Sequence, residues 1–323
     1  MPDLPANVNE ATDPNSGWTV YTARQGATEI RLVPAAGCNV ISIEHHGRQL
    51  LKVPESFDKP LSFWCGTPVL YPTPGRTQDG RFTFGGQEFH FRPVGDCGAI
   101  HGVVNNALWE FVGAETDGER SELSCRLDFR PGSEWFDQFP LIHRLELTVS
   151  LRPGAVRWTY TVNNSTGTDA IPFGFGLHPW FLYHGARDQA YLTIPADQTM
   201  ELVDLKPTGE LIDVQGTPMD SRSGVCLQGF EVDAAYFGIG PDESVTIDYR
   251  DVDVRLALQA SAEFNHVVAY TPADSQTCCI ENWTCAPNAH NLHARGIQRS
   301  ANLQVVPPGK SHSGWIELQV EAG

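Results

Sequence analysis

The stretch 142–162, IHRLELTVSLRPGAVRWTYTV, decides the fold class. Apolar and polar residues alternate along both of its halves, and Pro153-Gly154 separates the halves. Successive side chains of a strand point to opposite faces, so this alternation is typical of strands with one buried face. Proline followed by glycine favours a tight turn. The stretch therefore predicts two long antiparallel strands, at 142–151 and 155–162.

Shorter runs of the same alternation occur along most of the chain. Residues 81–91 predict a further hairpin, because Gly85-Gly86 can adopt the positive φ of a two-residue turn. Other strands are expected at 18–24, 29–33, 39–44, 108–113, 122–129, 191–194, 245–249, 254–259, 267–270, 277–281 and 314–320. No run of helical period extends beyond a turn or two.

The pattern predicts an all-β fold, a large sandwich or barrel. No shift in composition and no low-complexity linker divides the chain, so we expect a single domain over 1–323. Residues 1–16 are polar and are expected to form a flexible N-terminal extension. Residues 54–74 and 202–224 are expected to be loops with short structured pieces.

Composition and charge argue against several classes of protein. The 323 residues carry a net charge of −17, and the 22 basic residues form no run or stripe. Nucleic acid and anionic membranes are therefore not expected as partners. The polar start lacks the pattern of a signal peptide, and no apolar run approaches the roughly 18 residues of a membrane span. The eight cysteines include no C-x-x-C pair, which favours reduced thiols in a cytoplasmic protein.

A second stretch, 171–181 (IPFGFGLHPWF), places a histidine in apolar, glycine-spaced surroundings. Gly174 and Gly176 lack side chains, so another backbone or a ligand can approach closely. Pro179 pushes His178 towards an extended conformation. A lone histidine of this kind is more often a core residue at the end of a strand. A stiffly held imidazole is also what a proton donor requires.

Glu281 is the carboxylate that strengthens the functional interpretation of His178. It follows the apolar residues Cys278-Cys279-Ile280, so we expect partial burial, which raises a carboxyl pKa unless a partner holds the charge. A buried glutamate beside a histidine is a candidate acid–base pair. The residues alone do not bring the two side chains together, and the structural and functional interpretations both stay open.

Three further polar residues are candidates for substrate binding because of their apolar or glycine-rich surroundings. Arg76 ends the segment YPTPGR, His101 stands in AIHG, and Asp233 stands in FEVDAAYF. Each also has a structural explanation: a solvated turn residue, a histidine bonded to a loop carbonyl, or a turn cap.

Motifs for other chemistries are absent or incomplete. There is no nucleophile elbow, no P-loop and no complete dinucleotide-binding fingerprint. His45-His46 and His290-x-x-His293 offer metal-ligand atoms, but neither belongs to a full ligand set. We therefore expect no metal site.

The segments YPTPGRTQDGRFTFGGQEFHF, AIHG, IPFGFGLHPWF, VDAAYF and IENW resemble, in order and spacing, the motifs of the aldose 1-epimerase (galactose mutarotase-like) family. The resemblance extends from about Ile30 to the closing PPGKSHSGWIELQV. It implies a β-supersandwich of large antiparallel sheets with an open, sugar-sized cleft. It also implies an isomerase that interconverts the α and β anomers of a free aldohexose. Its partner would be a small-molecule sugar, with no cofactor or metal.

Position by position, the resemblance implies that Glu281 is the general base and His178 the general acid. His101 would bind near the ring oxygen, and Arg76 and Asp233 would hold sugar hydroxyls. The base takes the proton of the C1 hydroxyl while the acid protonates the ring oxygen, and the roles reverse on closure. Each such group typically contributes about 10²–10⁴ in rate. The state expected at the start of a turnover has Glu281 ionised and His178 protonated.

The chain departs from the family pattern at three positions beside these residues. Gly75 replaces a common Asn, Asn282 a common Pro, and Trp180 a common Tyr. These changes spare the acid and the base and bear on sugar preference. Trp180 or Trp283 could stack on the sugar, although an aromatic in a sheet is more often core packing.

Two alternatives to a mutarotase of free sugars follow from the same resemblance. One is a hexose-6-phosphate mutarotase, which would need additional basic residues at the cleft. The other is a non-catalytic carbohydrate-binding or regulatory protein, which would need neither an acid nor a base. A monomer and a homodimer are both compatible with the sequence.

Overall fold

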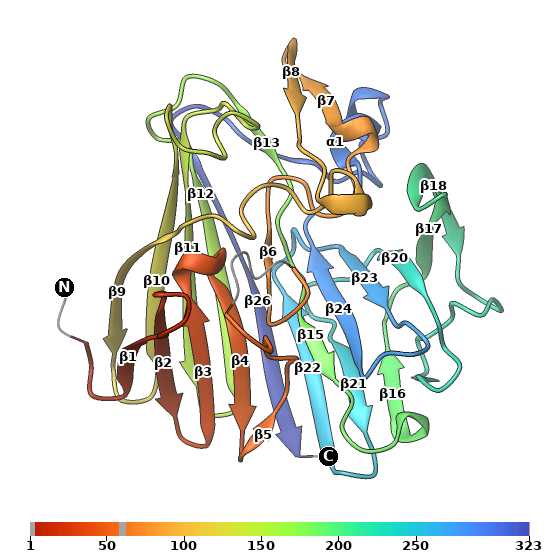
Figure 1. Cartoon of the computed structure of the whole chain (residues 1–323). Coiled ribbons are helices and arrows are strands. Elements are labelled where there is room, and N and C mark those ends of the chain that lie inside the picture. The colour runs from red at the N-terminus through yellow and green to blue at the C-terminus, as the bar shows by residue number, and fades with distance from the viewer. Residues whose placement is uncertain (1–3, 58–62, 323) are drawn as a thin grey trace.

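The computed structural model describes residues 4–57 and 63–322, and most of its regular structure is β-strand (Figure 1). The strands form two large antiparallel sheets, a five-stranded sheet and two pairs of strands. β11 (His143–Arg152) and β12 (Ala155–Asn163) pair along their length. This confirms the two strands predicted from the stretch 142–162, and with them the all-β fold.

The first large sheet has nine strands and turns one face to the core. Every second residue along β12 is buried, as expected for a strand covered on one side. In sheet order the strands are β19 (Val225–Cys226), β16 (Ala190–Thr193), β21 (Val245–Tyr249), β22 (Val254–Ala260), β26 (Ser311–Ala322), β12, β11, β10 (Ser121–Phe129) and β9 (Glu110–Thr116).

The second large sheet has eight strands, of which β24 is buried at every residue. In sheet order the strands are β18 (Lys206–Asp213), β17 (Gln198–Val203), β20 (Asp233–Phe237), β23 (His266–Tyr270), β24 (Thr277–Trp283), β14 (Gly176–Leu177) and β6 (Val69–Leu70), and β15 (Trp180–Leu182) also pairs with β24.

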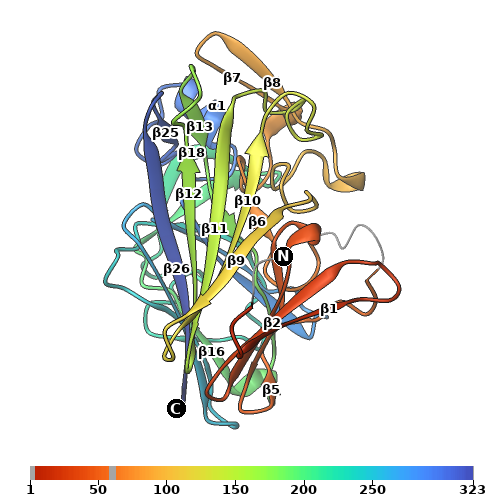
Figure 2. The same cartoon turned by 90° about the vertical axis from the view of Figure 1, so that its left-hand side faces the viewer.

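Three smaller groups of strands and a few short helices complete the fold. The five-stranded sheet consists of β1 (Val8–Thr12), β2 (Thr19–Gln25), β3 (Thr28–Val33), β4 (Asn39–His45) and β5 (Arg48–Gln49), and it lies beside β9–β11 in Figure 2. The two-stranded pairs are β7 (Arg81–Phe84) with β8 (Gln87–His90), and β13 (Ile171–Phe173) with β25 (Gln304–Val306). The described helices are short: α1 (Ala289–Ala294) and 3-10 turns at Pro34–Ala36, Gln78–Gly80, Gly95–Cys97 and Arg187–Gln189.

One large hydrophobic core joins the three main sheets. Leu147 of β11 and Ile316 of β26 belong to the same buried cluster as Ile280 of β24 and Leu32 of β3. Sheets that pack face to face bury the inward residues of each strand in this way. At one end of the molecule, α1 lies against the β7–β8 hairpin (Figure 1), and the ring of Phe82 stacks on His290 at 3.9 Å.

Two expectations from the sequence are wrong. Residues 8–12, expected within a flexible extension, form β1 and pair with β2. The stretch 202–224, expected as a loop with only short structured pieces, contains the eight-residue β18 and the end of β17, which pair with each other. Residues 1–3 of the expected extension, and 58–62 of the loop expected at 54–74, lie outside the described residues.

Candidate active site

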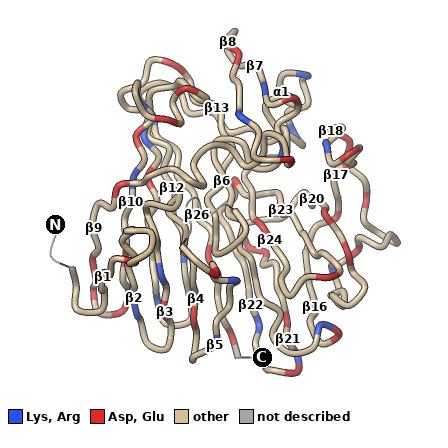
Figure 3. The backbone as a smooth tube through the Cα atoms, viewed as in Figure 1, with Lys and Arg blue, Asp and Glu red and all other residues tan. Residues whose placement is uncertain are grey.

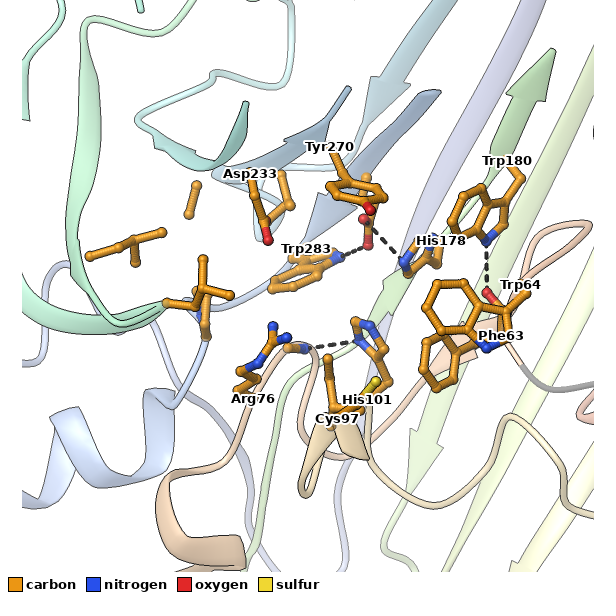
Figure 4. Close-up of a pocket in the computed structure, with 18 residues that line it drawn as sticks. Phe63, Trp64, Arg76, Cys97, His101, His178, Trp180, Asp233, Tyr270 and Trp283 are labelled. Carbon is orange, nitrogen blue, oxygen red and sulfur yellow. Dashed lines mark hydrogen bonds and ion pairs between the residues drawn. The ribbon is translucent and has the colours of Figure 1, made fainter. Parts of the chain in front are cut away.

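An open cleft of about 800 Å³, its mouth included, lies over β20, β23 and β24. The loop residues at 63–64, 75–76 and 97–101 form its other walls (Figure 4). The five residues singled out from the sequence all line this cleft, namely Arg76, His101, His178, Asp233 and Glu281. Positions up to 205 residues apart in the chain therefore meet in one place.

His178 and Glu281 are in contact at the floor of the cleft. His178 Nε2 lies 3.4 Å from Glu281 Oε1, and the two side chains expose only 7% and 2% of their surface. His178 Nδ1 is buried and has no hydrogen-bond partner within 4–57 and 63–322. The pairing that the sequence left open is therefore present in the fold.

Strand register explains how these two residues come together. Glu281 lies on β24, between β23 on one side and β14 and β15 on the other. In the chain, His178 and Pro179 lie between β14 and β15. Because both of these strands pair with β24, His178 lies next to β24. Alternation along β24 places Cys279, Glu281 and Trp283 on one face. On the other face, Cys278 and Ile280 belong to the main core.

Burial shifts the pKa of both groups towards their neutral forms. Desolvation raises the pKa of Glu281 well above its usual value, the charge of Asp233 adds to the rise, and the Trp283 hydrogen bond opposes it. Desolvation lowers the pKa of His178 to about 3. In the free protein the pair therefore holds one proton, and burial favours that proton on Glu281. The ionised glutamate and protonated histidine expected at the start of a turnover therefore have burial against them, and that state stays a prediction.

His101 is held by a reciprocal pair of hydrogen bonds with Gly75. The His101 backbone N–H donates to the Gly75 carbonyl (2.9 Å), and the Gly75 N–H donates to His101 Nδ1 (3.2 Å). Because Nδ1 accepts, the neutral ring carries its proton on Nε2. Burial, followed by the charges of His178 and Arg76, lowers the pKa of His101 well below its usual value. His101 therefore offers the cleft a neutral N–H donor.

The backbone at His101 is in the left-handed region, with φ of 63°. Non-glycine residues adopt this region uncommonly, so the packing around the loop must hold His101 in it. At the next position, Gly102 (φ 72°), an added Cβ would collide with the Tyr71 carbonyl. The glycine therefore lets the His101 loop pack tightly against the chain that leads to Arg76.

Arg76 and Asp233 face the cleft from opposite walls (Figure 4). Asp233 is exposed at the start of β20, where desolvation raises its pKa and the charge of Arg76 opposes the rise. Lysines and arginines are few and scattered (Figure 3). Within the described residues, Arg76 is the single Lys or Arg of the cleft lining. Both side chains present hydrogen-bonding groups where a polar ligand would lie.

Trp283 has a role that the sequence did not reveal. Its indole Nε1–H donates to Glu281 Oε2 at 3.1 Å, and its side chain is buried. The ring is held between Gly75 and Gly176: a Cβ at either position would clash with it. The stretch 171–181 predicted a close approach at Gly176, but the approaching group is this indole and not a backbone or ligand. Trp283 fixes one carboxylate oxygen and leaves Oε1 turned to His178.

Aromatic rings support His178 on its other side. Trp180 stacks on its imidazole at 5.1 Å, and the Trp180 indole donates to the Phe63 carbonyl at 2.7 Å. Trp64 lies beside Trp180 at 5.7 Å and is 46% exposed at the rim. Of the three departures from the family pattern, Gly75 and Trp180 thus line the cleft. Asn282 faces the interior between the two large sheets.

The histidine pairs considered as metal ligands join no cluster of three potential ligands in the described parts of the chain. His290 Nε2 bonds the Pro172 carbonyl (3.2 Å), and His45 Nδ1 bonds the Thr28 hydroxyl (2.9 Å). Both rings therefore have structural partners. The cluster that those residues do contain is His178, Cys279 and Glu281, of which His178 and Glu281 line the cleft and Cys279 is buried beside them.

Comparison with known proteins agrees with this geometry. The sequence model of the aldose 1-epimerase family matches residues 19–319. The chain belongs to the aldose 1-epimerase family. This confirms the resemblance inferred from the sequence motifs.

Individual relatives are distant in sequence and close in fold. A galactose mutarotase-like protein of Clostridium acetobutylicum superposes with a TM-score of 0.88 at 21% identity, with 100% of each chain covered. A galactose 1-epimerase of Lactobacillus acidophilus gives 0.79 at 15% identity, with 99% and 100% covered. The uncharacterized protein YihR of Escherichia coli is 23% identical over 255 residues, 77% of each chain. These likenesses establish the β-supersandwich that the resemblance implied.

A search of the described helices finds no segment that is both long enough and apolar enough to cross a membrane.

Proposed function

We propose that this member of the family is a mutarotase that interconverts the α and β anomers of a free aldohexose. The observation that carries the proposal is the contact between His178 Nε2 and Glu281 Oε1, 3.4 Å, at the floor of a sugar-sized cleft. A buried carboxyl and a buried imidazole that share one proton can give a proton to one oxygen and take one from another. Ring opening requires that pair of transfers.

The short distance between His178 Nε2 and Glu281 Oε1 suits the chemistry of the anomeric carbon. The hydroxyl oxygen and the ring oxygen of a pyranose are both bonded to C1, so an acid and a base must approach from neighbouring positions. In the proposed reaction Glu281 takes the C1 hydroxyl proton and His178 protonates the ring oxygen. The open aldehyde rotates about C1–C2, and the two residues return the protons when the ring closes on the other face.

Although burial favours the neutral form of both groups, the proposed reaction requires a proton on His178 and an ionised Glu281 when sugar is bound. Bound sugar favours these charged forms, because its hydroxyls displace water and offer hydrogen bonds to both charged groups. His101, as a neutral Nε2–H donor, is placed to bind the ring oxygen region. Arg76 and Asp233 hold hydroxyls at the mouth of the cleft. These residues orient the ring, and no other charged group is required for the two proton transfers.

A free sugar fits the lining better than a phosphorylated one. Arg76 is the single Lys or Arg among the described lining residues, whereas a phosphate at neutral pH carries up to two charges and is usually met by several cations or backbone amides. Tyr270, Trp283 and Trp180 provide flat apolar surfaces suited to the C–H faces of a pyranose.

Polarimetry on freshly dissolved α-D-galactose, α-D-glucose and a hexose 6-phosphate tests the proposal. We expect the wild-type protein to accelerate the change in rotation for a free sugar, and Glu281→Gln and His178→Asn to lose most of that acceleration. No acceleration with any sugar would favour a carbohydrate-binding protein without turnover. Acceleration that survives both substitutions would contradict the assigned acid and base.

A further inference from the structure

Cys279 is a third potential ligand atom beside the acid–base pair, and the proposed reaction does not use it. It lies two residues before Glu281 on β24, so both side chains point to the same face of the strand. Its thiol is fully buried. One ligand atom each from His178, Cys279 and Glu281 lies within 4.8 Å of the other two.

The spacing of these atoms is close to that of a zinc site. Zinc bonds of about 2.0–2.3 Å to nitrogen, oxygen and sulfur place the ligands of a tetrahedral site roughly 3.3–3.7 Å apart. His178 Nε2 and Glu281 Oε1 are already 3.4 Å apart. The Cys279 sulfur lies within 4.8 Å of both atoms, so a shift of up to about 1 Å would complete three of the four positions.

We propose that His178, Cys279 and Glu281 form a binding site for Zn²⁺, and that the bound cation blocks the cleft to sugar. Two of the three ligands are the groups that must stay free to move protons. Zinc and sugar therefore compete for the same groups. Bound zinc excludes sugar from the cleft whether or not the protein uses that cleft for mutarotation.

Charge balance favours a doubly charged cation at this place. A thiolate, a carboxylate and a neutral imidazole supply two negative charges, so the complex with Zn²⁺ is neutral and can remain buried. The thiol and carboxyl protons leave to solvent when the cation binds. Burial, followed by the charge of Glu281, raises the pKa of the Cys279 thiol well above its usual value, so the cation must displace that proton.

The surroundings orient the carboxylate for this purpose. The Trp283 indole holds Glu281 Oε2, which leaves Oε1 for the cation. His178 and Glu281 line the open cleft, so the cation can enter from solvent. The fourth position would face the cleft and hold a water. A soft thiolate ligand selects Zn²⁺ over Mg²⁺ and Ca²⁺, which prefer oxygen ligands.

Calorimetric titration with Zn²⁺ tests the site on the wild-type protein, Cys279→Ala and Cys279→Ser, with Cys97→Ala as a matched control. Cys97 lines the same cleft, but its thiol is not part of the cluster. We expect binding to weaken at least about a hundredfold without the Cys279 thiol, since even outer-shell changes cost roughly 10–100-fold. Cys97→Ala should bind as the wild type does.

Cobalt(II) provides a readout that does not depend on activity. In protein with Cys97 and Cys226 replaced by alanine, bound Co²⁺ should show a thiolate-to-cobalt charge-transfer band, and D-galactose should diminish it. Equal zinc affinity with and without Cys279, or no charge-transfer band, would overturn the proposal. These binding measurements decide the zinc site even if polarimetry finds no mutarotation.

Discussion

Two buried histidines in this molecule differ in what surrounds them. His143 lies in the core, where Nε2 meets the Tyr71 hydroxyl at 2.6 Å, Nδ1 meets the Leu141 carbonyl at 2.7 Å, and the ring stacks on Phe129 at 4.2 Å. His178 lies at the floor of the cleft, with Glu281 on one nitrogen and no partner within the described residues on the other.

Burial alone does not distinguish the two histidines. Desolvation lowers the pKa of His143 to about 4 and that of His178 to about 3. The difference lies in the partners: fixed neutral groups satisfy the first ring completely, whereas the second contacts a titratable carboxyl at the floor of a cleft. A shifted pKa therefore marks a functional histidine only when the ring also has a titratable partner and is accessible to a ligand.

The largest expected effect comes from removing the carboxyl of the cleft pair. Glu281→Gln keeps the size of the side chain but cannot accept the proton, so mutarotation should slow by about 10²–10⁴. The pKa of Glu281 is higher in the folded protein than in the unfolded chain. The folded state therefore loses stability as pH rises above the pKa of the unfolded chain, because the unfolded chain ionises first. The variant should therefore unfold at equal or higher denaturant concentration at pH 8, which would separate lost chemistry from lost folding.

The core histidine should show the reverse behaviour. His143→Ala removes a buried ring and leaves the Tyr71 hydroxyl and the Leu141 carbonyl unpaired, which should cost about 3–5 kcal/mol in the free energy of unfolding. The kcat of the folded fraction should stay within about twofold of the wild-type value. For comparison, a tenfold change in rate corresponds to about 1.4 kcal/mol in activation free energy. Urea unfolding and polarimetry on the same preparation would check both. A large fall in kcat of folded protein would erase the contrast between the two histidines.

Trp283→Phe should produce an intermediate effect. It keeps a ring between Gly75 and Gly176 but removes the hydrogen bond to Glu281. A hydrogen bond to a charged acceptor is worth about 1.5–3 kcal/mol, which corresponds to roughly 10–100-fold in rate. That hydrogen bond lowers the Glu281 pKa, so its loss should move the alkaline limb of the pH–rate profile upward.

Trp109→Phe is the matched control for this substitution. It loses an indole bond to the Val104 carbonyl (3.3 Å) outside the cleft. Its pH–rate profile should match that of the wild type. An unmoved alkaline limb in Trp283→Phe would reduce Trp283 to a packing residue.

The last expected effect concerns stability alone, and it is the acid sensitivity of four of the buried histidines. Burial lowers the pKa of His143, His266 and His290 to about 4 and that of His178 to about 3. As pH falls below about 6.5, the unfolded state takes up protons first, so each histidine should lower the free energy of unfolding until the pH reaches its folded pKa. Urea midpoints measured from pH 7 to pH 4 should fall steadily. A flat profile would show that these rings are not buried neutral.

Strand alternation made much of this fold predictable. β11 and β12 are long, half-buried and joined by Pro153-Gly154, so local pattern and final structure agree. β1 escaped prediction because four of its five residues are exposed. The β17–β18 turn was also missed, because Asp204 and Leu205 take positive φ without a glycine.

The site was predictable in its residues but not in its contacts. His178 and Glu281 stood out by their apolar surroundings, and the family motifs set them together with Arg76, His101 and Asp233. The Trp283 hydrogen bond and the placement of Cys279 depend on strand register and on packing against Gly75 and Gly176. A local sequence pattern does not encode such contacts. Gly75 and Trp283, for example, lie about two hundred residues apart in the chain.

A double-substitution cycle measured by polarimetry tests the central claim that His178 and Glu281 act as one unit. Groups that act together on one transition state lose their joint contribution when either is removed. The account predicts that His178→Asn combined with Glu281→Gln is no slower than the worse single variant. Rate losses that multiply across the two sites would contradict it, because they would show two residues acting independently of each other.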